Sequence, residues 1–463
     1  MQLSSTHLVS LILVLLLSLV PSLYAGRKVK SEEDFSVGGR SAGTVLVAGS
    51  IIGTIVGGAA TVGTAQLGFT LGLAAWWFTL GSGIALLIMA TFYARPLRQS
   101  GLTTISEFLV VSYGKKAGPL ASLAATAGIF FSIVASTLTA LNLIAGIFRL
   151  SLPLAAILLV TIVLGFVFLG GINGSGMAGL FKIGLIFATL FVSGSVAFQH
   201  LGGLNGLTQT FPAAPWFSLF GGGVQYALVN LLSLVIGIIS TQTYIQALFS
   251  AKDSKTAAVG CVVAALIVIP VGLPSVIIGM FMHVNHPGIS SIEALPLYLT
   301  LYMPDWLGGA ALAALVLSAI GSIAGLSLGC STMLTRDIFK AVLGFEKGQQ
   351  LLWINRSLVL VITVTATIFT FYHLDSYVLE WNYLSMALRG AGVFLPLTFA
   401  IAFKNRIAPG AGLAAMLAGI LVALTWKFLV PGAGQALFPS LAFNLLFLIP
   451  GVLFAGKVKR HEL

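Results

Sequence analysis

Apolar runs of about twenty residues recur along the whole chain and constrain its fold more than any other feature. An α-helix of about twenty residues is needed to cross the hydrocarbon core of a membrane. Roughly thirteen such segments can be recognised, near residues 6–25, 43–66, 70–93, 118–148, 153–171, 176–198, 223–250, 256–283, 306–334, 352–373, 376–402, 411–430 and 437–456. A membrane β-barrel would need shorter strands in which apolar and polar side chains alternate. We therefore expect an all-α membrane protein with about 13 transmembrane helices.

The composition excludes the soluble classes of protein. Of the 463 residues, 58% are apolar and 8% are charged, whereas a soluble globular chain has roughly 25% charged residues. So few charges cannot cover a water-soluble surface, and 31 Phe residues argue against a disordered chain. The net charge of +11 does not indicate nucleic-acid binding, because the basic residues lie in short loops between apolar runs. The expected environment is the lipid bilayer, with no nucleic acid as partner.

Lys and Arg residues are concentrated in every second loop. Nineteen of the 23 basic residues follow the odd-numbered segments, and the positive-inside rule then places the N-terminus outside and the C-terminus in the cytoplasm. We expect a multi-pass protein of the cell (inner) membrane. The segment near 6–25 could instead be a cleaved signal peptide ending at Ala25, but no basic residue precedes Arg27, which favours an uncleaved helix.

The segment at 43–66 contains an unusual number of glycines. Gly49, Gly53 and Gly57 are spaced by four residues, which is typical of close helix packing in membranes. The Gly57-Gly58 doublet favours local unwinding instead. Unwound backbone is tolerated in a bilayer only where it is buried or lines a cavity. Both interpretations stay open, and one helix could satisfy both.

The segment at 223–250 contains four successive polar residues, Ser240-Thr241-Gln242-Thr243. Ser and Thr hydroxyls can bond to the backbone of their own helix, whereas the Gln242 amide needs other partners. The two unusual segments are five apart in the series. This spacing predicts two inverted five-helix repeats, 43–198 and 223–402, with a ligand site between the two interruptions.

Six short stretches, in the expected order, resemble the sodium/solute symporter family. They are Asp34–Arg40, Arg95–Arg98 with Thr103–Phe108, Phe168–Gly171, Gln242 with Ala251–Asp253, Ser331–Asp337, and Gly410-Ala411. The resemblance implies a five-plus-five inverted-repeat transport core. We expect an N-terminal extra helix and cytoplasmic loop at 1–42, the ten-helix core at 43–402, and two C-terminal helices with a short tail at 403–463.

The same resemblance implies sodium-coupled import of a small organic solute by alternating access. Carried over by position, the sodium ligands are the backbone carbonyls of Gly53, Val56 and Ser318 and the hydroxyl of Ser322. Hard oxygen ligands of this kind suit an alkali cation. No enzymatic activity and no cofactor are expected, apart from Na⁺ as the coupling ion.

One position departs from the pattern of the family. Its members usually present two adjacent hydroxyl residues in the segment at 306–334, whereas this chain has Gly321 before Ser322. Without the family, Ser322 would be interpreted as a packing residue in a glycine-rich stretch. Because one hydroxyl is missing, proton coupling and uncoupled transport stay as alternatives.

Arg389 lies well inside the segment at 376–402, where a charged side chain is a functional candidate by default. An ion pair with Glu380, about 13 Å away along the helix axis, and snorkelling towards the membrane surface are the alternatives. We predict that Arg389 is the counter-ion of an anionic, carboxylate-bearing substrate. The other residues expected to contact substrate are Thr54, Gly57, Gln242, Asn382 and Tyr383.

Three other functions are alternatives to a symporter. A channel would need a pore-lining ring repeated by symmetry, and none is visible in the sequence. A membrane enzyme would need a catalytic constellation, which is also not visible. A non-transporting sensor built on a transporter scaffold stays as an alternative. The sequence names neither the solute nor the oligomeric state.

Overall fold

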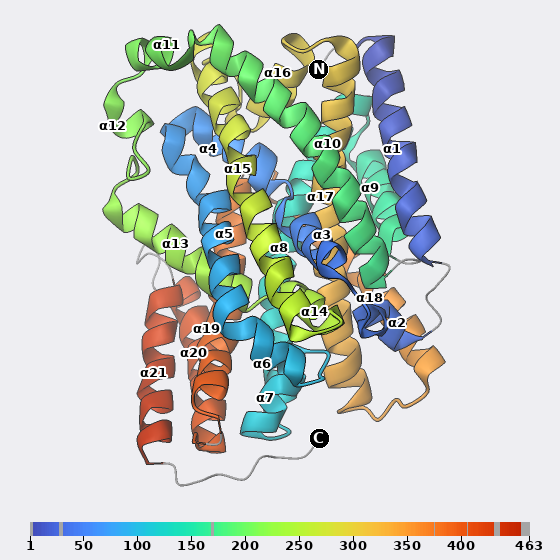
Figure 1. The fold of residues 1–463 in the computed structure, drawn as a ribbon, viewed down its shortest axis with the longest axis vertical. Coiled ribbons are helices and arrows are strands. Elements are labelled where there is room, and N and C mark those ends of the chain that lie inside the picture. The colour runs from blue at the N-terminus through green and yellow to red at the C-terminus, as the bar shows by residue number, and fades with distance from the viewer. Residues whose placement is uncertain are drawn as a thin grey trace.

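The computed structural model describes residues 3–26, 31–167, 171–374, 376–404, 406–429 and 436–454. Within these ranges the regular structure is helical, and an isolated bridge between Ala42 and Ala251 is the only other element. Most of the long helices run close to the long axis of the molecule (Figure 1). The prediction of an all-α fold is confirmed.

Every expected apolar segment overlaps a helix or an interrupted helix. The single helices are α1 (Ser5–Gly26), α8 (Ala117–Phe148), α9 (Leu152–Val167), α10 (Gly171–His200), α15 (Ser254–Asn285), α18 (Gly348–Phe371), α19 (Val378–Ala402), α20 (Pro409–Leu429) and α21 (Leu437–Leu453). Two helices continue into π-helical turns: α5 (Trp77–Ile88) into η4 (Met89–Tyr93), and α17 (Asp305–Met333) into η6 (Leu334–Lys340). The interrupted segments are α3 (Thr44–Ile55) with η2 (Ala59–Gly63) and α4 (Thr64–Leu71), and α13 (Val224–Ile239) with α14 (Gln242–Ser250).

By length and hydropathy, fewer helices qualify as membrane spans than the 13 segments expected from the sequence. Among the described residues, eight helical stretches are long and apolar enough to span a membrane, and the bent pair α13–α14 makes a ninth. Shorter apolar helices, including parts of α1, α3, α9 and α21, account for other expected segments. The count of 13 and the division into 1–42, 43–402 and 403–463 stay predictions.

Several short helices lie where the hydropathy pattern indicated only loops. They are α2 (Glu32–Val37), η1 (Gly38–Arg40), α6 (Ala94–Gln99), α7 (Ile105–Tyr113), α11 (Gly203–Thr210), α12 (Ala213–Trp216), η5 (Ser291–Glu293) and α16 (Ala294–Leu301). A further short helix, η3 (Gly72–Trp76), lies at the start of the expected segment 70–93. Two of them begin with a capping box, formed by Ser31 with Asp34 and by Thr104 with Glu107. In each box the two side chains satisfy backbone N–H groups that the first turn leaves free.

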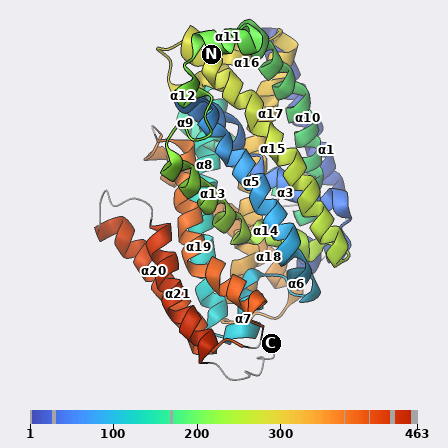
Figure 2. The same cartoon turned by 60° about the vertical axis from the view of Figure 1, so that its left-hand side comes forward.

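The packing of the helices places α17 near the centre of the bundle. In the continuous stretch of α17 and η6 (Asp305–Lys340), 94% of the most apolar 18 residues are buried. The helix α17 contacts α1, α8, α10 and α3. The helices α3 and α10 pack together, as do α8 and α19. The C-terminal pair α20 and α21 lies on the flank beside α19, whereas α1 lies on the opposite flank (Figures 1 and 2).

A polar network closes the end of the bundle that contains α2 and α7, at the bottom of Figure 1. Arg336 on η6 donates to Glu32 from Nη2 at 2.6 Å and from Nε at 3.1 Å, and its Nη1 lies 3.5 Å from Glu107 Oε1. Arg40 donates to the carbonyl of Leu102 at 2.9 Å. These contacts join α2, η1, α7 and η6, which lie far apart in the sequence.

Candidate functional site

The first interruption follows α3, which ends at Ile55. Val56 has φ −78° and ψ 73°, outside the helical region, and the chain resumes as a π-helix at Ala59. A Cβ atom at residue 57 would overlap the hydroxyl of Ser322 on α17, so glycine is needed there for the close approach of the two segments. The unwinding predicted from the Gly57-Gly58 doublet is present.

The glycines of α3 also serve for packing. The backbones of α3 and α10 are so close that a Cβ atom at Gly179 would overlap the carbonyl oxygen of Gly49 and lie 2.9 Å from Gly53 Cα. A Cβ at Gly49 would in turn lie 2.7 Å from the carbonyl oxygen of Gly176. The two interpretations of this segment, packing and unwinding, are both correct for the structure.

The second interruption lies between α13 and α14, which are bent by 47°. Ser240 and Thr241 donate to carbonyls of their own helix, at Ile236 (2.7 Å) and Gly237 (2.6 Å). Thr243 does not follow this pattern, because its hydroxyl donates across to the carbonyl of Gly325 on α17 at 3.0 Å. The interruption predicted from the four polar residues is present.

The carbonyls predicted to bind sodium converge on the side chain of Lys182. This lysine lies on α10, and its Nζ donates to the carbonyl oxygens of Gly53 at 2.6 Å, Val56 at 2.8 Å and Ser318 at 3.3 Å. The residue is 2% exposed. The three predicted carbonyls therefore do converge in the structure, and the group that they surround is the amino nitrogen of a side chain of the protein itself.

The two serines of the predicted site use their hydroxyls elsewhere. Ser318 Oγ donates to the carbonyl of Val56 at 2.7 Å, and Ser322 Oγ donates to the carbonyl of Thr54. The predicted fourth ligand, Ser322, thus makes no hydrogen bond with Lys182 Nζ. The interruption after α3 is instead fastened to α17 by both hydroxyls.

No carboxylate balances the charge of Lys182 among the residues that the structure describes. The ion pairs found there join His7 to Asp305, Arg40 to Glu33, and Arg336 to Glu32 and Glu107. A sodium ion on the same carbonyls would have to lie beside the ammonium. Two unit charges about 4 Å apart repel by about 4 kcal/mol at an effective dielectric constant of about 20. Sodium can therefore bind to the predicted carbonyl oxygens only if Lys182 Nζ moves away from them.

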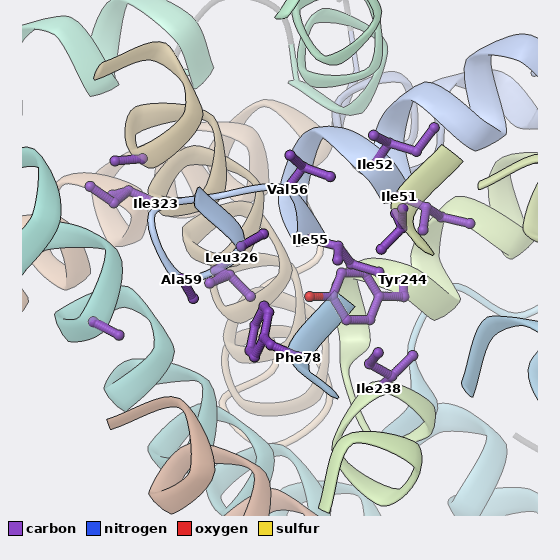
Figure 3. Packing of buried hydrophobic residues seen from close by; sticks show 14 of the residues in the cluster. Ile51, Ile52, Ile55, Val56, Ala59, Phe78, Ile238, Tyr244, Ile323 and Leu326 are labelled. Atoms are coloured by element: carbon purple, nitrogen blue, oxygen red, sulfur yellow. The ribbon is translucent and has the colours of Figure 1, made fainter. Parts of the chain in front are cut away.

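A small central cavity lies between the two interruptions. Its polar lining residues are Thr54, Ser82, Ser132, Ser136, Tyr244, Ser322, Asn382 and Arg389. The cavity volume is about 20 Å³, which holds about one water molecule. Figure 3 shows the apolar side chains around this region, with Val56 beside the interruption and Tyr244 and Phe78 facing each other. The structure is closed around the cavity.

Arg389 lies beside this cavity and has no acidic partner among the described residues. The residue is 1% exposed, and Nη1 lies 3.4 Å from Ser132 Oγ, whereas Nε has no hydrogen-bond partner among the described atoms. Glu380 is exposed and makes no ion pair with it in the described structure. The ion-pair alternative is therefore not what the structure shows.

The other predicted substrate residues separate into three groups. Thr54, Gly57 and Asn382 line the central cavity with Arg389. Tyr383 lines a different cavity of about 540 Å³. Gln242 lies apart from both, because its amide donates to the carbonyl of Thr103 at 3.0 Å and accepts from the N–H of Ile105 at 2.9 Å.

In this structure Gln242 bonds to backbone groups away from the central cavity, and its contact with substrate stays a prediction. Both ends of its amide hold the start of α7 against α14. The Gln242 amide, which apolar surroundings could not satisfy, is hydrogen-bonded to backbone groups, so Gln242 has a structural role in this conformation.

Lys182 is the residue that the sequence reasoning missed. It lies within the apolar segment 176–198, between Phe181 and Ile183. The signal was available, because an ionisable residue inside a membrane segment is a functional candidate. The same rule that makes Arg389 a candidate also makes Lys182 one.

Two interrupted helices that meet at a buried polar cavity, within an all-helical membrane bundle, define a transporter of the inverted-repeat class. The chain belongs to the sodium:solute symporter family, whose model matches residues 35–419. This membership indicates a transporter rather than an enzyme.

Named relatives carry several kinds of solute. The High-affinity choline transporter 1 of Drosophila melanogaster is 28% identical over 389 residues, which cover 78% of this chain and 61% of that protein. The sodium/proline symporter of Salmonella typhimurium is 23% identical, with 92% of this chain and 89% of the relative covered. The sodium/glucose cotransporter of Vibrio parahaemolyticus is 23% identical, with 73% and 68% covered.

A solved structure shares the fold across almost the whole chain. It is the substrate-bound outward-open state of a Na⁺-coupled sialic acid symporter, with a TM-score of 0.83, 18% identity, and 99% of both chains covered. At this identity the likeness shows the fold alone.

Proposed function

We propose that this protein is a secondary transporter that imports a small, carboxylate-bearing organic solute by alternating access. The observation that carries the proposal is Arg389, a buried guanidinium at a central cavity with no carboxylate partner among the described residues. Solute transport by the relatives supports the transport part of the proposal. An anion that enters the cavity supplies the missing counter-charge.

The chemistry of the cavity suits a carboxylate. A guanidinium binds a carboxylate with two parallel hydrogen bonds, and Arg389 Nε is free to donate in the described structure. Asn382 and Ser132 provide further polar atoms at the same place. Because the cavity holds only about 20 Å³, a solute of this kind can enter only when the surrounding helices move apart. Movement of this kind is what alternating access requires.

Arg389→Lys is expected to lower the catalytic efficiency of carboxylate uptake about ten- to a hundredfold. An ammonium cannot reproduce the two-pronged contact, and a charge-assisted hydrogen bond contributes about 1.5–3 kcal/mol. The assay is uptake of radiolabelled proline and sialic acid into proteoliposomes, with choline and glucose compared in parallel. The exposed Arg95→Lys is the matched control and should transport normally.

Two results would contradict the proposed substrate class. One is normal transport of a carboxylate by Arg389→Gln. The other is uptake of choline or glucose with no carboxylate transported or bound. Binding of a carboxylate without any uptake would instead support the alternative of a sensor on a transporter scaffold.

The coupling ion is the second part of the proposal. Family membership supports sodium as the coupling ion, as we expected. In this chain, however, sodium can reach the oxygens of Gly53, Val56 and Ser318 only after the ammonium of Lys182 leaves them. Proton coupling and uncoupled transport are the alternatives, and uptake under imposed sodium or proton gradients distinguishes them.

The orientation in the membrane also belongs to the proposal. Because basic residues follow the odd segments, single cysteines introduced near Lys116, Lys252 and Lys347 should resist an impermeant thiol reagent applied outside intact cells. One introduced near Gly203 should react. The native Cys261 and Cys330 are buried, so background labelling should be low. Labelling of the Lys252 loop from outside would overturn the topology.

A further inference from the structure

We infer that Lys182 is a tethered cation that takes the place of sodium between α3 and α17. Its ammonium bonds the carbonyl oxygens of Gly53 and Val56 at the interruption of α3 and that of Ser318 on α17. A cation at this position joins two segments that belong to different repeats. In this chain the joining charge is supplied by a side chain of α10, so no sodium ion binds at this place.

The hydrogen bonding of the ammonium is complete. A lysine ammonium has three N–H donors and no acceptor, and three carbonyl oxygens lie within 2.6–3.3 Å of Nζ. The Ser318 hydroxyl donates to the Val56 carbonyl oxygen, which also accepts from Nζ, and the Ser322 hydroxyl donates to the carbonyl of Thr54. Each N–H of the ammonium therefore has a carbonyl partner, and the Val56 oxygen accepts a second hydrogen bond, so a sodium ion would have to displace Nζ from these oxygens.

Gly321 provides independent support for this assignment. A Cβ atom at residue 321 would lie 3.0 Å from Lys182 Nζ and 3.2 Å from the carbonyl oxygen of Gly53. The ammonium of Lys182 thus lies directly against the place that a serine or threonine side chain at 321 would occupy. The chain thus has a lysine ammonium directly beside the position at which it lacks the second hydroxyl of the family pattern.

The approach of α10 makes the tether possible. The absence of a side chain at Gly179, one helical turn before Lys182, lets α10 lie against the backbone of Gly49 and Gly53. The lysine then reaches the end of α3 while staying 2% exposed. A longer side chain at 179 would hold the ammonium away from its carbonyls.

The decisive measurement is sodium binding by the purified full-length protein without any solute. Radioactive sodium binding, and thermal unfolding in sodium chloride against equimolar potassium chloride, are measured for the wild type, Lys182→Ala and Lys182→Ala/Gly321→Ser. Lys255→Ala, which removes an exposed lysine, is the control. Because the tether rests on the proposed transport cycle but this assay contains no solute, its outcome is separate from that of the Arg389 experiment.

We expect the double variant to bind sodium at least about a hundredfold more tightly than the wild type, since the substitutions remove a charge and add a hydroxyl ligand. Lys182→Ala should gain less, and Lys255→Ala should match the wild type. Equal sodium affinity in the wild type and the double variant would overturn the assignment.

If the Lys182 variants fail to fold, the single variant Gly321→Ser tests whether Lys182 takes the place of sodium. With Nζ still in place, the added hydroxyl should not raise the sodium affinity, and it should lower the unfolding temperature because it presses on the ammonium. A sodium affinity raised by Gly321→Ser in the wild-type background would contradict the tethered cation.

Discussion

Gly179→Leu is expected to prevent stable folding or to lower the free energy of unfolding by about 3 kcal/mol or more. A side chain at this position would overlap the carbonyl oxygen of Gly49 and approach Gly53 Cα. Both obstacles are backbone atoms, so no rotation of a side chain can make room. The helices α3 and α10 would have to separate, and Lys182 would lose its contact with Gly53.

Gly184→Leu on the same helix is the matched control. A Cβ atom there meets no other atom within 4 Å, and the residue is exposed. Thermal unfolding and the yield of monodisperse protein should therefore be close to those of the wild type. Equal stability of the two variants would show that α10 does not lie as close to α3 as in this structure.

Arg336→Ala is expected to lower the free energy of unfolding by about 3–5 kcal/mol, because it leaves a buried carboxylate without its partner. Glu32 is 7% exposed and receives two hydrogen bonds from the guanidinium of Arg336. Chemical denaturation in detergent measures the change. We also expect the end of the bundle at α2 and α7 to open more easily, since Arg336 joins these two helices.

The neighbouring Glu33 supplies the comparison for this prediction. Its side chain is 54% exposed in its ion pair with Arg40, and exposed pairs contribute about 1 kcal/mol or less. Glu33→Ala should therefore be nearly neutral. The double variant Glu32→Ala/Arg336→Ala should be more stable than the sum of the two single losses predicts. Additive losses would mean that the two side chains are not coupled.

The interruptions of the two repeats could be predicted from sequence because their cause is local. A glycine doublet at 57–58 and four polar residues at 240–243 disfavour a continuous helix in an apolar segment, whatever packs around them. The structure places the breaks at these residues. The short helices α2 and α7 escaped a search for long apolar runs, although the capping boxes at Ser31 and Thr104 are visible as motifs.

The identity of the cation at the site could not be predicted in the same way. The carbonyls of Gly53, Val56 and Ser318 belong to two helices, and Lys182 belongs to a third. Their convergence depends on how α10 packs, which no local pattern reveals. Gln242 illustrates the same limit, because its partners at Thr103 and Ile105 lie more than a hundred residues away. The predicted motif at Phe168–Gly171 falls largely outside the described residues.

A cation that cannot leave the protein changes the electrical balance of transport. A sodium ion that travels with a monovalent anion cancels its charge, so the pair crosses the membrane potential without electrical work. Lys182 stays attached to α10, and its charge moves only as far as that side chain and helix move. A monovalent anion then crosses as one net negative charge, and an interior-negative potential opposes its import by about 2.3 kcal/mol per 100 mV. A solute that bears an ammonium group beside its carboxylate is neutral overall and meets no such opposition.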